Sequence, residues 1–266
     1  MRQFLSDAAP DKKGLLFVSG KKFIHLCRVL RVKPGDMLDV RVPGGFLLSM
    51  TVARIDDDRG IAVLQKCGEG KTSVSRGVGA ADIDKDRRIV EYTLFQFIAK
   101  PQKMEMIVRQ ACECGVKTIV PVAGEYSQKG NIASLTGKDE RFARIINEAR
   151  EQSGSPVETV VAETVDVRGA CDVWKRMSEK ARNTSAAVVL SERNDFCMPF
   201  SDAVFAGIVR AAIAVGCEGG ISPDEMTALR GAGFTPVHFA GNILRCETAA
   251  LYGIAAFQTA LAEFVK

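Results

Sequence analysis

The chain has 266 residues, of which 47% are hydrophobic and 26% charged, and it carries a formal net charge of +4. This composition excludes collagen-like, disulfide-stapled and intrinsically disordered chains. No apolar run reaches the roughly 18 residues that a transmembrane helix needs, and the first residues lack the basic-then-apolar order of a signal peptide. We therefore expect a cytoplasmic protein with no membrane partner, folded as one large domain or as two unequal ones.

Cysteine and histidine offer little material for a metal site. The eight cysteines are scattered, and only Cys112 and Cys114 lie close together, so the paired C-x-x-C spacing of a structural zinc site is absent. We interpret the cysteines mostly as small buried hydrophobic residues. The only histidines are His25 and His238, which are too few for a His-rich metal site and leave little for a His-based triad. We expect no bound metal.

Basic residues are concentrated in the N-terminal quarter. Residues 1–75 contain 13 Lys and Arg against 8 Asp and Glu, whereas residues 76–266 contain 23 against 24. A basic module next to a nearly neutral one suggests a domain that docks on a polyanion, attached to a working domain. Ordinary surface lysines are the alternative interpretation on charge alone.

From residue 14 to about residue 66, short β-prone runs alternate with turn sequences. The runs are GLLFV, DMLDVRV, FLLSMTVARI and GIAVLQ, and the turns contain Pro-Gly or Asp clusters, so the segment predicts a small β-barrel. One helix, over residues 21–32, is predicted from apolar residues at i, i+3, i+4 and i+7. Residues 67–88 are rich in Gly, Ser and charge, which is typical of a linker. We place the domain boundary between residues 72 and 73.

Beyond residue 88, strands alternate with longer amphipathic segments, which predicts an α/β domain with a mainly parallel sheet and helices on both faces. The expected strands cover residues 89–99, 117–122, 157–162, 186–190, 210–216 and 235–240. The expected helices cover residues 102–114, 139–152 and 170–181, a segment that begins at Pro223, and a closing segment from about Ile243 to Phe264.

Two glycine-rich turns follow two of these strands. The first, GCEGG at residues 216–220, precedes a helix whose start is marked by a capping box of Ser222 and Glu225. The second is AGN at residues 240–242. Loops at the carboxyl ends of neighbouring strands form ligand sites in open α/β sheets, although glycine turns before helices are also common without a ligand. The fingerprint G-x-G-x-x-G is absent, which argues against a Rossmann-type NAD or methyltransferase site.

The two turns carry a resemblance to a known family. The segments GCEGGIS at residues 216–222 and AGNILRCETA at residues 240–249 are similar to the GPEGG-F-S and LG-x-R-ILR-x-ETA motifs of the RsmE family, the 16S ribosomal RNA uridine N3-methyltransferases of the SPOUT superfamily. HLCRVLR at residues 25–31, KPQKME at residues 100–105 and EQSG at residues 151–154 also resemble motifs of this family. The matches keep the family's order over nearly the whole chain, so they are more specific than any single motif.

The resemblance implies a fold and an activity. It implies a PUA-like β-barrel over residues 1–72 that grips RNA, and a SPOUT methyltransferase domain over residues 73–266 whose C-terminal part forms a trefoil knot. Loops of the knot would bind S-adenosylmethionine, and the protein would work as a homodimer on 16S ribosomal RNA within the 30S subunit. The expected reaction transfers a methyl group from the sulfonium to N3 of a uridine.

The resemblance also assigns residues to roles. Those implied in cofactor binding lie in three loops and, for Thr248, in the first turn of the last helix: Leu190, Ser191, Gly216, Glu218, Gly219, Gly220, Phe239, Ala240, Gly241, Ile243, Leu244, Arg245 and Thr248. Arg245 would stabilise the uracil anion, and Glu218 would accept or orient the proton. A structural pair of Arg245 with Glu218 or Glu247 is the alternative. The expected RNA contacts are Lys21, Lys22, Arg28, Arg31, Lys100 and Lys103. Arg28 and Arg31 could instead bridge the two domains.

Four positions depart from the family pattern. Tyr126, Ser155 and Asn242 stand where the family usually has Arg, and Cys217 stands where it has Pro. Charge-assisted hydrogen bonds typically contribute about 1.5–3 kcal/mol each, so the missing arginines would weaken phosphate or anion contacts. Two alternatives to the uridine methyltransferase therefore stay open: a catalytically silent RNA-binding protein of this fold, and a SPOUT methyltransferase for another RNA base.

Overall fold

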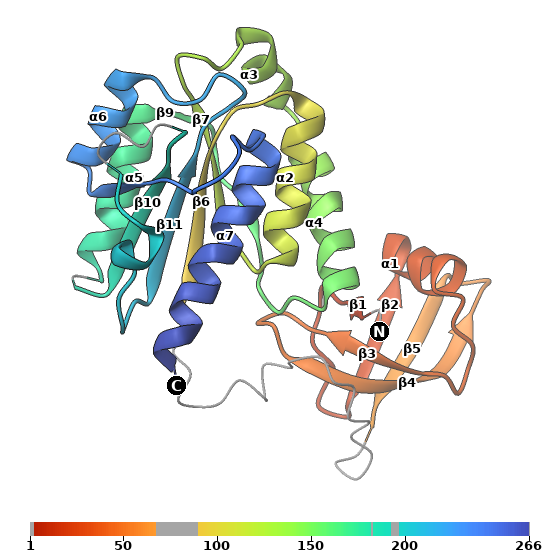
Figure 1. The fold of residues 1–266 in the computed structure, drawn as a ribbon. Helices are drawn as coiled ribbons and strands as arrows, with labels where there is room; N and C mark the ends of the chain where they lie inside the picture. The colour runs from red at the N-terminus through yellow and green to blue at the C-terminus, as the bar shows by residue number, and fades with distance from the viewer. Residues whose placement is uncertain (1–2, 68–89, 182, 193–196, 266) are drawn as a thin grey trace. The chain divides into compact units, whose positions relative to one another are not determined.

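The computed structural model describes residues 3–67, 90–181, 183–192 and 197–265, and the chain divides into two compact units (Figure 1). The first comprises residues 1–84 and 150–156, and the second comprises residues 85–149 and 157–266. The predicted boundary between residues 72 and 73 falls outside the described residues. Within the described ranges, no helix is long and apolar enough to cross a membrane, and no group of three His, Cys, Asp or Glu side chains is placed to hold a metal ion.

The first unit is built on a five-stranded sheet with the order β1-β3-β4-β5-β2. The strands are β1 (Phe4–Leu5), β2 (Leu15–Ser19), β3 (Met37–Arg41), β4 (Leu47–Asp56) and β5 (Ile61–Lys66). β1 runs parallel to β3, and the other pairs are antiparallel. Because successive side chains alternate between the faces of a strand, one set forms a core in which Val40, Met50 and Leu64 are fully buried. The four predicted strands are confirmed, and β1 is an addition to them.

The predicted helix over residues 21–32 is shorter and less regular than expected. α1 (Gly20–Ile24) continues directly into a π-helical turn, His25–Val29, and the Leu30 N–H donates to a carbonyl five residues earlier at 2.9 Å. Arg31 then adopts a left-handed conformation with φ of 56°, so the chain leaves the helical region before the predicted end. Leu26 is fully buried, as the apolar spacing predicts.

A buried arginine ties residues 150–156 to the sheet of the first unit. Arg41 is 2% exposed, and its guanidinium donates to Gln3 Oε1 at 2.7 Å, Gly45 O at 2.6 Å and Gly154 O at 3.0 Å. The Gln3 amide donates in turn to the backbone carbonyl of residue 150 at 2.7 Å. The EQSG segment therefore has a structural role in this unit, because its backbone supplies an acceptor for a buried cation.

The second unit contains a sheet in which every described strand pair is parallel. The order is β12-β10-β11-β6-β7-β8, and β9 also pairs with β7. The strands are β6 (Glu91–Phe97), β7 (Thr118–Ala123), β8 (Val160–Val161), β9 (Val165–Asp166), β10 (Ser185–Leu190), β11 (Arg210–Val215) and β12 (Phe234–Val237). β6, β10 and β11 are buried along most of their length, as expected for a parallel sheet covered on both faces. The predicted α/β fold with a mainly parallel sheet is confirmed.

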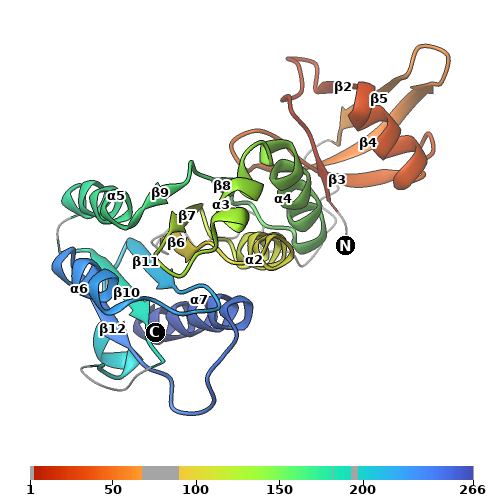
Figure 2. The same ribbon diagram turned by 90° about the horizontal axis from the view of Figure 1, so that it is seen from above.

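Helices cover both faces of this sheet (Figures 1 and 2). α2 (Pro101–Glu113) and α7 (Cys246–Ala262) pack against each other on one face, with α4 (Asp139–Ser153) beside α2. α5 (Val167–Glu179) and α6 (Pro223–Gly231) pack together on the opposite face. The short helix α3 (Lys129–Leu135) is not among the predicted elements.

The C-terminal elements differ from the prediction in a way that shapes the site. β12 ends at Val237 rather than at residue 240, and α7 begins at Cys246 rather than at Ile243. Arg245 is the N-cap residue, and its extended backbone (φ −65°, ψ 151°) cannot belong to a helix. Residues 238–245 consequently form an irregular loop, which is long enough to wall a cavity.

Candidate active site

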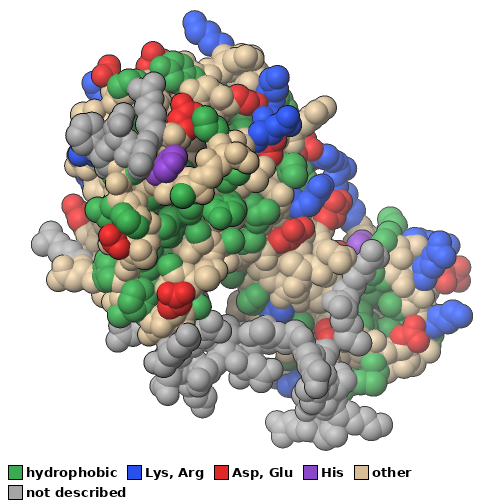
Figure 3. Space-filling model, viewed as in Figure 1, with side chains coloured by type: hydrophobic (Ala, Val, Ile, Leu, Met, Phe, Trp, Pro, Cys, Tyr) green, Lys and Arg blue, Asp and Glu red, His purple; other side chains and the backbone are tan. Residues whose placement is uncertain are grey.

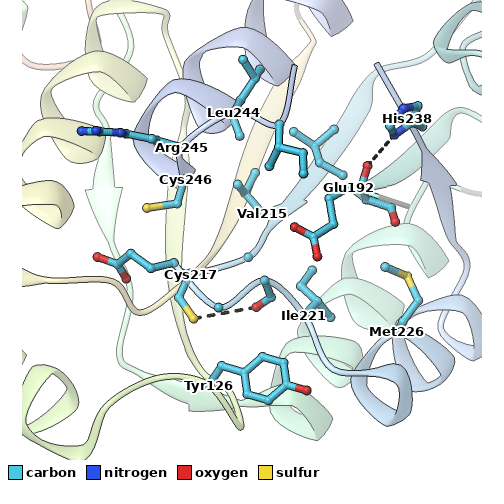
Figure 4. A pocket seen from close by; sticks show the side chains of 18 of the residues that line it. Tyr126, Glu192, Val215, Cys217, Ile221, Met226, His238, Leu244, Arg245 and Cys246 are labelled. Atoms are coloured by element: carbon cyan, nitrogen blue, oxygen red, sulfur yellow. Dashed lines mark hydrogen bonds between the residues drawn. The ribbon is translucent and has the colours of Figure 1, made fainter. Parts of the chain in front are cut away.

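A cavity of about 770 Å³ opens at the carboxyl ends of β10, β11 and β12 (Figure 4). Its walls come from residues 190–192 at the end of β10, residues 215–221 around the end of β11 and most of residues 238–246 after β12. Further side chains come from α2 and α6. Open parallel sheets bind ligands at this edge, and the volume lies within the range of small-molecule sites, roughly 300–1,000 Å³.

Most of the residues implied in cofactor binding line this cavity, and three do not. Those that line it are Leu190, Ser191, Gly216, Glu218, Gly219, Gly220, Phe239, Ile243, Leu244 and Arg245. Ala240, Gly241 and Thr248 do not line it, and all three are exposed. The structure therefore brings the three loops together, while the binding roles of their residues stay predictions.

The loop after β11 folds back on itself because glycines occupy both of its ends. A Cβ added to Gly216 would lie 2.7 Å from the carbonyl carbon of Gly220, and Gly220 has a φ of +80°, which other residues rarely adopt. The Gly220 N–H donates to Cys217 O at 3.0 Å, and the Cys217 thiol donates to Gly220 O at 3.8 Å. Cysteine at the position of the family's proline thus adds a hydrogen bond within the turn.

A buried glutamine beneath this loop fixes the point where the loop leaves β11. Gln96 on β6 is fully buried, and its amide donates to Val215 O at 3.3 Å and to Gly216 O at 3.2 Å. Buried carbonyl groups need a donor, so the glutamine sets the position of both peptide groups. Sequence reasoning missed Gln96, whose only signal is a polar residue inside the apolar strand pattern TLFQF.

The helix after the loop begins as predicted and also holds a neighbouring loop. Glu225 N–H donates to Ser222 Oγ at 3.4 Å, and Ser222 N–H donates to Glu225 Oε2 at 2.9 Å, which confirms the capping box. The second carboxylate oxygen of Glu225 accepts from Glu125 N–H at 2.7 Å. The next side chain, Tyr126, is 45% exposed and lines the cavity, and its Cβ would lie 2.8 Å from a Cβ added to Gly219. Glu225 therefore connects α6 to a second wall of the cavity.

Two of the three positions at which the family usually has Arg lie at the cavity. Tyr126 and Asn242 line it, whereas Ser155 is 6% exposed in the first unit. Among the described residues, the arginines that line the cavity are Arg230 and Arg245. The replacements therefore remove positive charge from the cavity wall, and these two guanidinium groups remain there.

At one side of the cavity, Lys103 from α2 meets two carboxylates. Its Nζ lies 3.0 Å from Glu247 Oε2, 3.5 Å from Glu218 Oε1 and 3.9 Å from Cys246 Sγ. Burial, and the hydrogen bond that the thiol donates to Glu247, raise the pKa of Cys246 to about 12. In the described part of the chain, the cation that pairs with both carboxylates is Lys103, and the exposed Arg245 pairs with neither. The alternative structural pair of Arg245 is therefore not formed.

Apolar side chains and one histidine complete the walls. Val215, Met226 and Leu244 are apolar residues of the lining (Figure 4). His238 Nδ1 lies 3.0 Å from Ser191 O, which links the segment after β12 to the segment after β10. The cavity thus combines an apolar interior with polar backbone and charged groups at its edges, which suits a ligand with a flat ring and charged ends.

The residues predicted to contact RNA lie in two places. In the helical segment of the first unit, Lys22 is half-buried and lies 3.8 Å from Asp7. Of the predicted contacts in that segment, Lys21, Arg28 and Arg31 are exposed. In the second unit, Lys100 is exposed at the N-cap of α2, but Lys103 takes part in the charged cluster. Lys103 is thus held by carboxylates at the cavity, whereas the Lys100 side chain is exposed.

Comparisons with known proteins bear on both the family and the fold. A family model, the RNA methyltransferase domain, matches residues 86–258. The ribosomal RNA small subunit methyltransferase E of Aquifex aeolicus is 32% identical over 160 residues, which are 60% of this chain and 64% of that protein. The ribosomal RNA small subunit methyltransferase E 2 of Borreliella burgdorferi is 24% identical over 271 residues, which cover 99% of both proteins.

A solved structure has the same fold. The ribosomal RNA small subunit methyltransferase E from Neisseria gonorrhoeae, bound to S-adenosyl methionine, matches with a TM-score of 0.77 at 24% identity over 98% of both chains. The family model covers well over half of this chain, and the motifs around the cavity are those that the resemblance rests on. The protein accordingly belongs to the RsmE family of ribosomal RNA methyltransferases, in the SPOUT superfamily.

Proposed function

We propose that the protein is an S-adenosylmethionine-dependent methyltransferase that modifies N3 of a uridine in 16S ribosomal RNA of the 30S subunit. The observation that carries this proposal is the cavity formed by the loops after β10, β11 and β12 in a chain of the RsmE family. Curated relatives are named ribosomal RNA small subunit methyltransferases E, and the solved relative from Neisseria gonorrhoeae is bound to S-adenosyl methionine.

The residues at the cavity fit this cofactor. Gly216, Gly219 and Gly220 line the cavity without side chains, so the loop backbone can approach a flat adenine ring closely. Val215 and Leu244 supply apolar walls, and the carboxylate of Glu218 offers negative charge to a cationic ligand. When bound, S-adenosylmethionine supplies a methyl group on a positively charged sulfur.

Arg245 and Glu218 would divide the chemistry at the uracil. Loss of the N3 proton leaves an anion on the base, and a guanidinium stabilises it because it is always charged and presents several donors. Arg245 is exposed and lines the cavity, so it can reach an incoming base. Glu218 Oε1 accepts a hydrogen bond from Lys100 N–H at 3.3 Å, which holds the carboxylate where it can accept the proton or orient the base.

Both units would hold the RNA. We infer that residues 1–72 act as the PUA-like barrel, in which Lys21, Lys22, Arg28 and Arg31 contact phosphates. Lys and Arg side chains also gather along the side of the second unit formed by α2 and α4 (Figure 3), which supports a further contact with RNA there. Residues 73–266 would form the SPOUT domain with a C-terminal trefoil knot, working as a homodimer. The parallel order β12-β10-β11 supports the expected fold of this domain.

Transfer of a labelled methyl group tests the proposal. Purified protein is incubated with labelled S-adenosylmethionine and 30S subunits that lack the modification, and the nucleosides are identified by mass spectrometry. We expect 3-methyluridine, and Arg245→Ala should lower kcat roughly 100-fold to 1,000-fold, the range for loss of one anion-stabilising donor. A different methylated nucleoside would point to another RNA base. RNA binding with neither methyl transfer nor cofactor binding would identify a silent RNA-binding protein, the alternative that the missing arginines favour.

A further inference from the structure

One lysine connects three elements around the cavity. Lys103 lies on α2, Glu218 lies in the loop after β11, and Glu247 lies in the first turn of α7. The lysine Nζ is 3.5 Å from the first carboxylate and 3.0 Å from the second. Within the described ranges, no other ion pair reaches either carboxylate, so Lys103 supplies the counter-charge for both.

The surroundings of Lys103 Nζ match its hydrogen-bonding capacity. An ammonium group has three N–H donors and no acceptor. Three acceptors surround this one, at 3.0 Å (Glu247 Oε2), 3.5 Å (Glu218 Oε1) and 3.9 Å (Cys246 Sγ), and only 25% of the side chain is exposed. A phosphate would have to displace one of these partners. The neighbouring Lys100 is exposed and meets no such obstacle.

We propose that Lys103 is a positioning residue of the cofactor site, which fastens the loop after β11 to the start of α7, and that it is not an RNA contact. The inference rests on the proposed function, because its readout is the affinity for S-adenosylmethionine. Both carboxylates lie within 3.5 Å of the same Nζ. Without the lysine they would have no counter-charge, and neighbouring like charges repel each other. The spacing between two walls of the cavity would then be lost, and Arg245 adjoins one of them.

The ionisation of these groups agrees with such a role. Burial lowers the pKa of Lys103, but the hydrogen bond to Glu247 and the neighbouring acidic groups outweigh burial and raise it overall. Burial raises the pKa of Glu247, but hydrogen bonds from its own backbone N–H, from Lys103 and from Cys246 lower it overall. Lys103 and Glu247 are therefore both charged at neutral pH, so the pair is an ion pair under the conditions in which the enzyme works.

Three variants of the full chain separate positioning from RNA contact. Lys103→Met removes the charge and keeps the aliphatic stem, whereas Lys103→Arg keeps the charge. Lys100→Met is the matched control, because Lys100 lies at the start of the same helix, is exposed, and has no side-chain ion pair within the described residues. Calorimetry gives the affinity for S-adenosylmethionine, and binding of a 16S ribosomal RNA fragment at several salt concentrations gives the number of phosphate contacts.

We expect Lys103→Met to weaken S-adenosylmethionine binding roughly 10-fold to 100-fold, the range for loss of a charge-assisted hydrogen bond, and to leave the salt dependence of RNA binding unchanged. Lys103→Arg should restore most of the affinity. Lys100→Met should leave cofactor binding unchanged and reduce the salt slope by roughly 0.7–0.9. Unchanged cofactor affinity in Lys103→Met, or a salt slope reduced as in the control, would overturn the inference.

Two further results complete the test. If Lys103→Met does not fold, Glu247→Gln weakens the shortest contact and leaves the lysine in place. A fall in cofactor affinity in that variant supports the inference, and an unchanged affinity overturns it. If the unmodified protein binds no S-adenosylmethionine, the proposed function itself fails, and the positioning role fails with it. Cofactor binding by the unmodified chain therefore distinguishes failure of the positioning role alone from failure of the proposed function.

Discussion

The carboxylate of Glu225 offers a direct test of how the cavity walls are held. It is 9% exposed and accepts from Ser222 N–H at 2.9 Å and from Glu125 N–H at 2.7 Å. Alanine at this position removes both acceptors. Loss of the cap costs about 1 kcal/mol and loss of a charge-assisted hydrogen bond about 1.5–3 kcal/mol. Glu225→Ala should therefore lower the unfolding free energy of the second unit by about 3 kcal/mol.

Thermal and urea unfolding followed by circular dichroism measure this loss. In a unit of this size, 1 kcal/mol shifts Tm by roughly 2–4 °C, so Tm should fall by about 6–12 °C. Ser222→Ala is the matched control, because it removes only the 3.4 Å bond from Glu225 N–H, and it should cost about 1 kcal/mol. Equal losses in the two variants would refute the reasoning, because the bond to Glu125 would then contribute nothing.

The remaining predictions concern the loop after β11, the first unit and the buried thiol. Gly216→Ala should weaken S-adenosylmethionine binding in calorimetry by at least about tenfold, because the new Cβ would lie 2.7 Å from the backbone of Gly220. Gly231→Ala is the control and should leave the affinity unchanged, because a Cβ there has no atom within 4 Å. Arg41→Met should lower the unfolding free energy in urea by about 3 kcal/mol, because three acceptors lose their donor; a loss no larger than that of Arg54→Met, at an exposed pair, would contradict this. Cys246 should resist iodoacetamide at about pH 8 in the folded protein, because its pKa is about 12, and mass spectrometry that finds it alkylated would contradict this. In the unfolded chain the Cys246 thiol ionises near its ordinary pKa of about 8.5, whereas the folded protein keeps it protonated at that pH. The stability that the buried thiol contributes should therefore be complete below about pH 8.5 and decline as pH rises beyond it.

Features coded by neighbouring residues could be predicted from the sequence. The start of α6 is one example, because Ser222 and Glu225 satisfy each other's backbone within a single turn. The strands of the first unit are another, because alternation and turn residues are local signals. The glycines of residues 216–220 likewise marked a tight loop, because their conformation depends on the absence of a side chain. The cavity edge was therefore predictable from short segments.

Features that depend on residues far apart in the sequence could not be predicted. Gln96 donates to carbonyls 119 and 120 residues away, and no local pattern announces those partners. The predicted start of α7 was wrong for a related reason. Ile243 continues the apolar pattern of the helix, but it is 74% exposed in the loop, and the helix begins only after the extended Arg245. Apolar residues that wall a cavity are indistinguishable in sequence from those on a helix face.

The number of unpaired basic side chains cannot be read from residue counts, because some of these side chains form ion pairs. Lys138 and Arg141 pair with Glu105 at 3.8 Å and 2.6 Å, and Lys103 is engaged at the cavity, so the side formed by α2 and α4 presents less free charge than its sequence suggests. Counterion release depends on the phosphates that cations neutralise. RNA binding by this side should therefore depend on salt less than its basic residues imply. In the helical segment of the first unit, the exposed Lys21, Arg28 and Arg31 have no ion pair among the described residues. That segment is therefore the stronger candidate for the salt-dependent part of RNA binding.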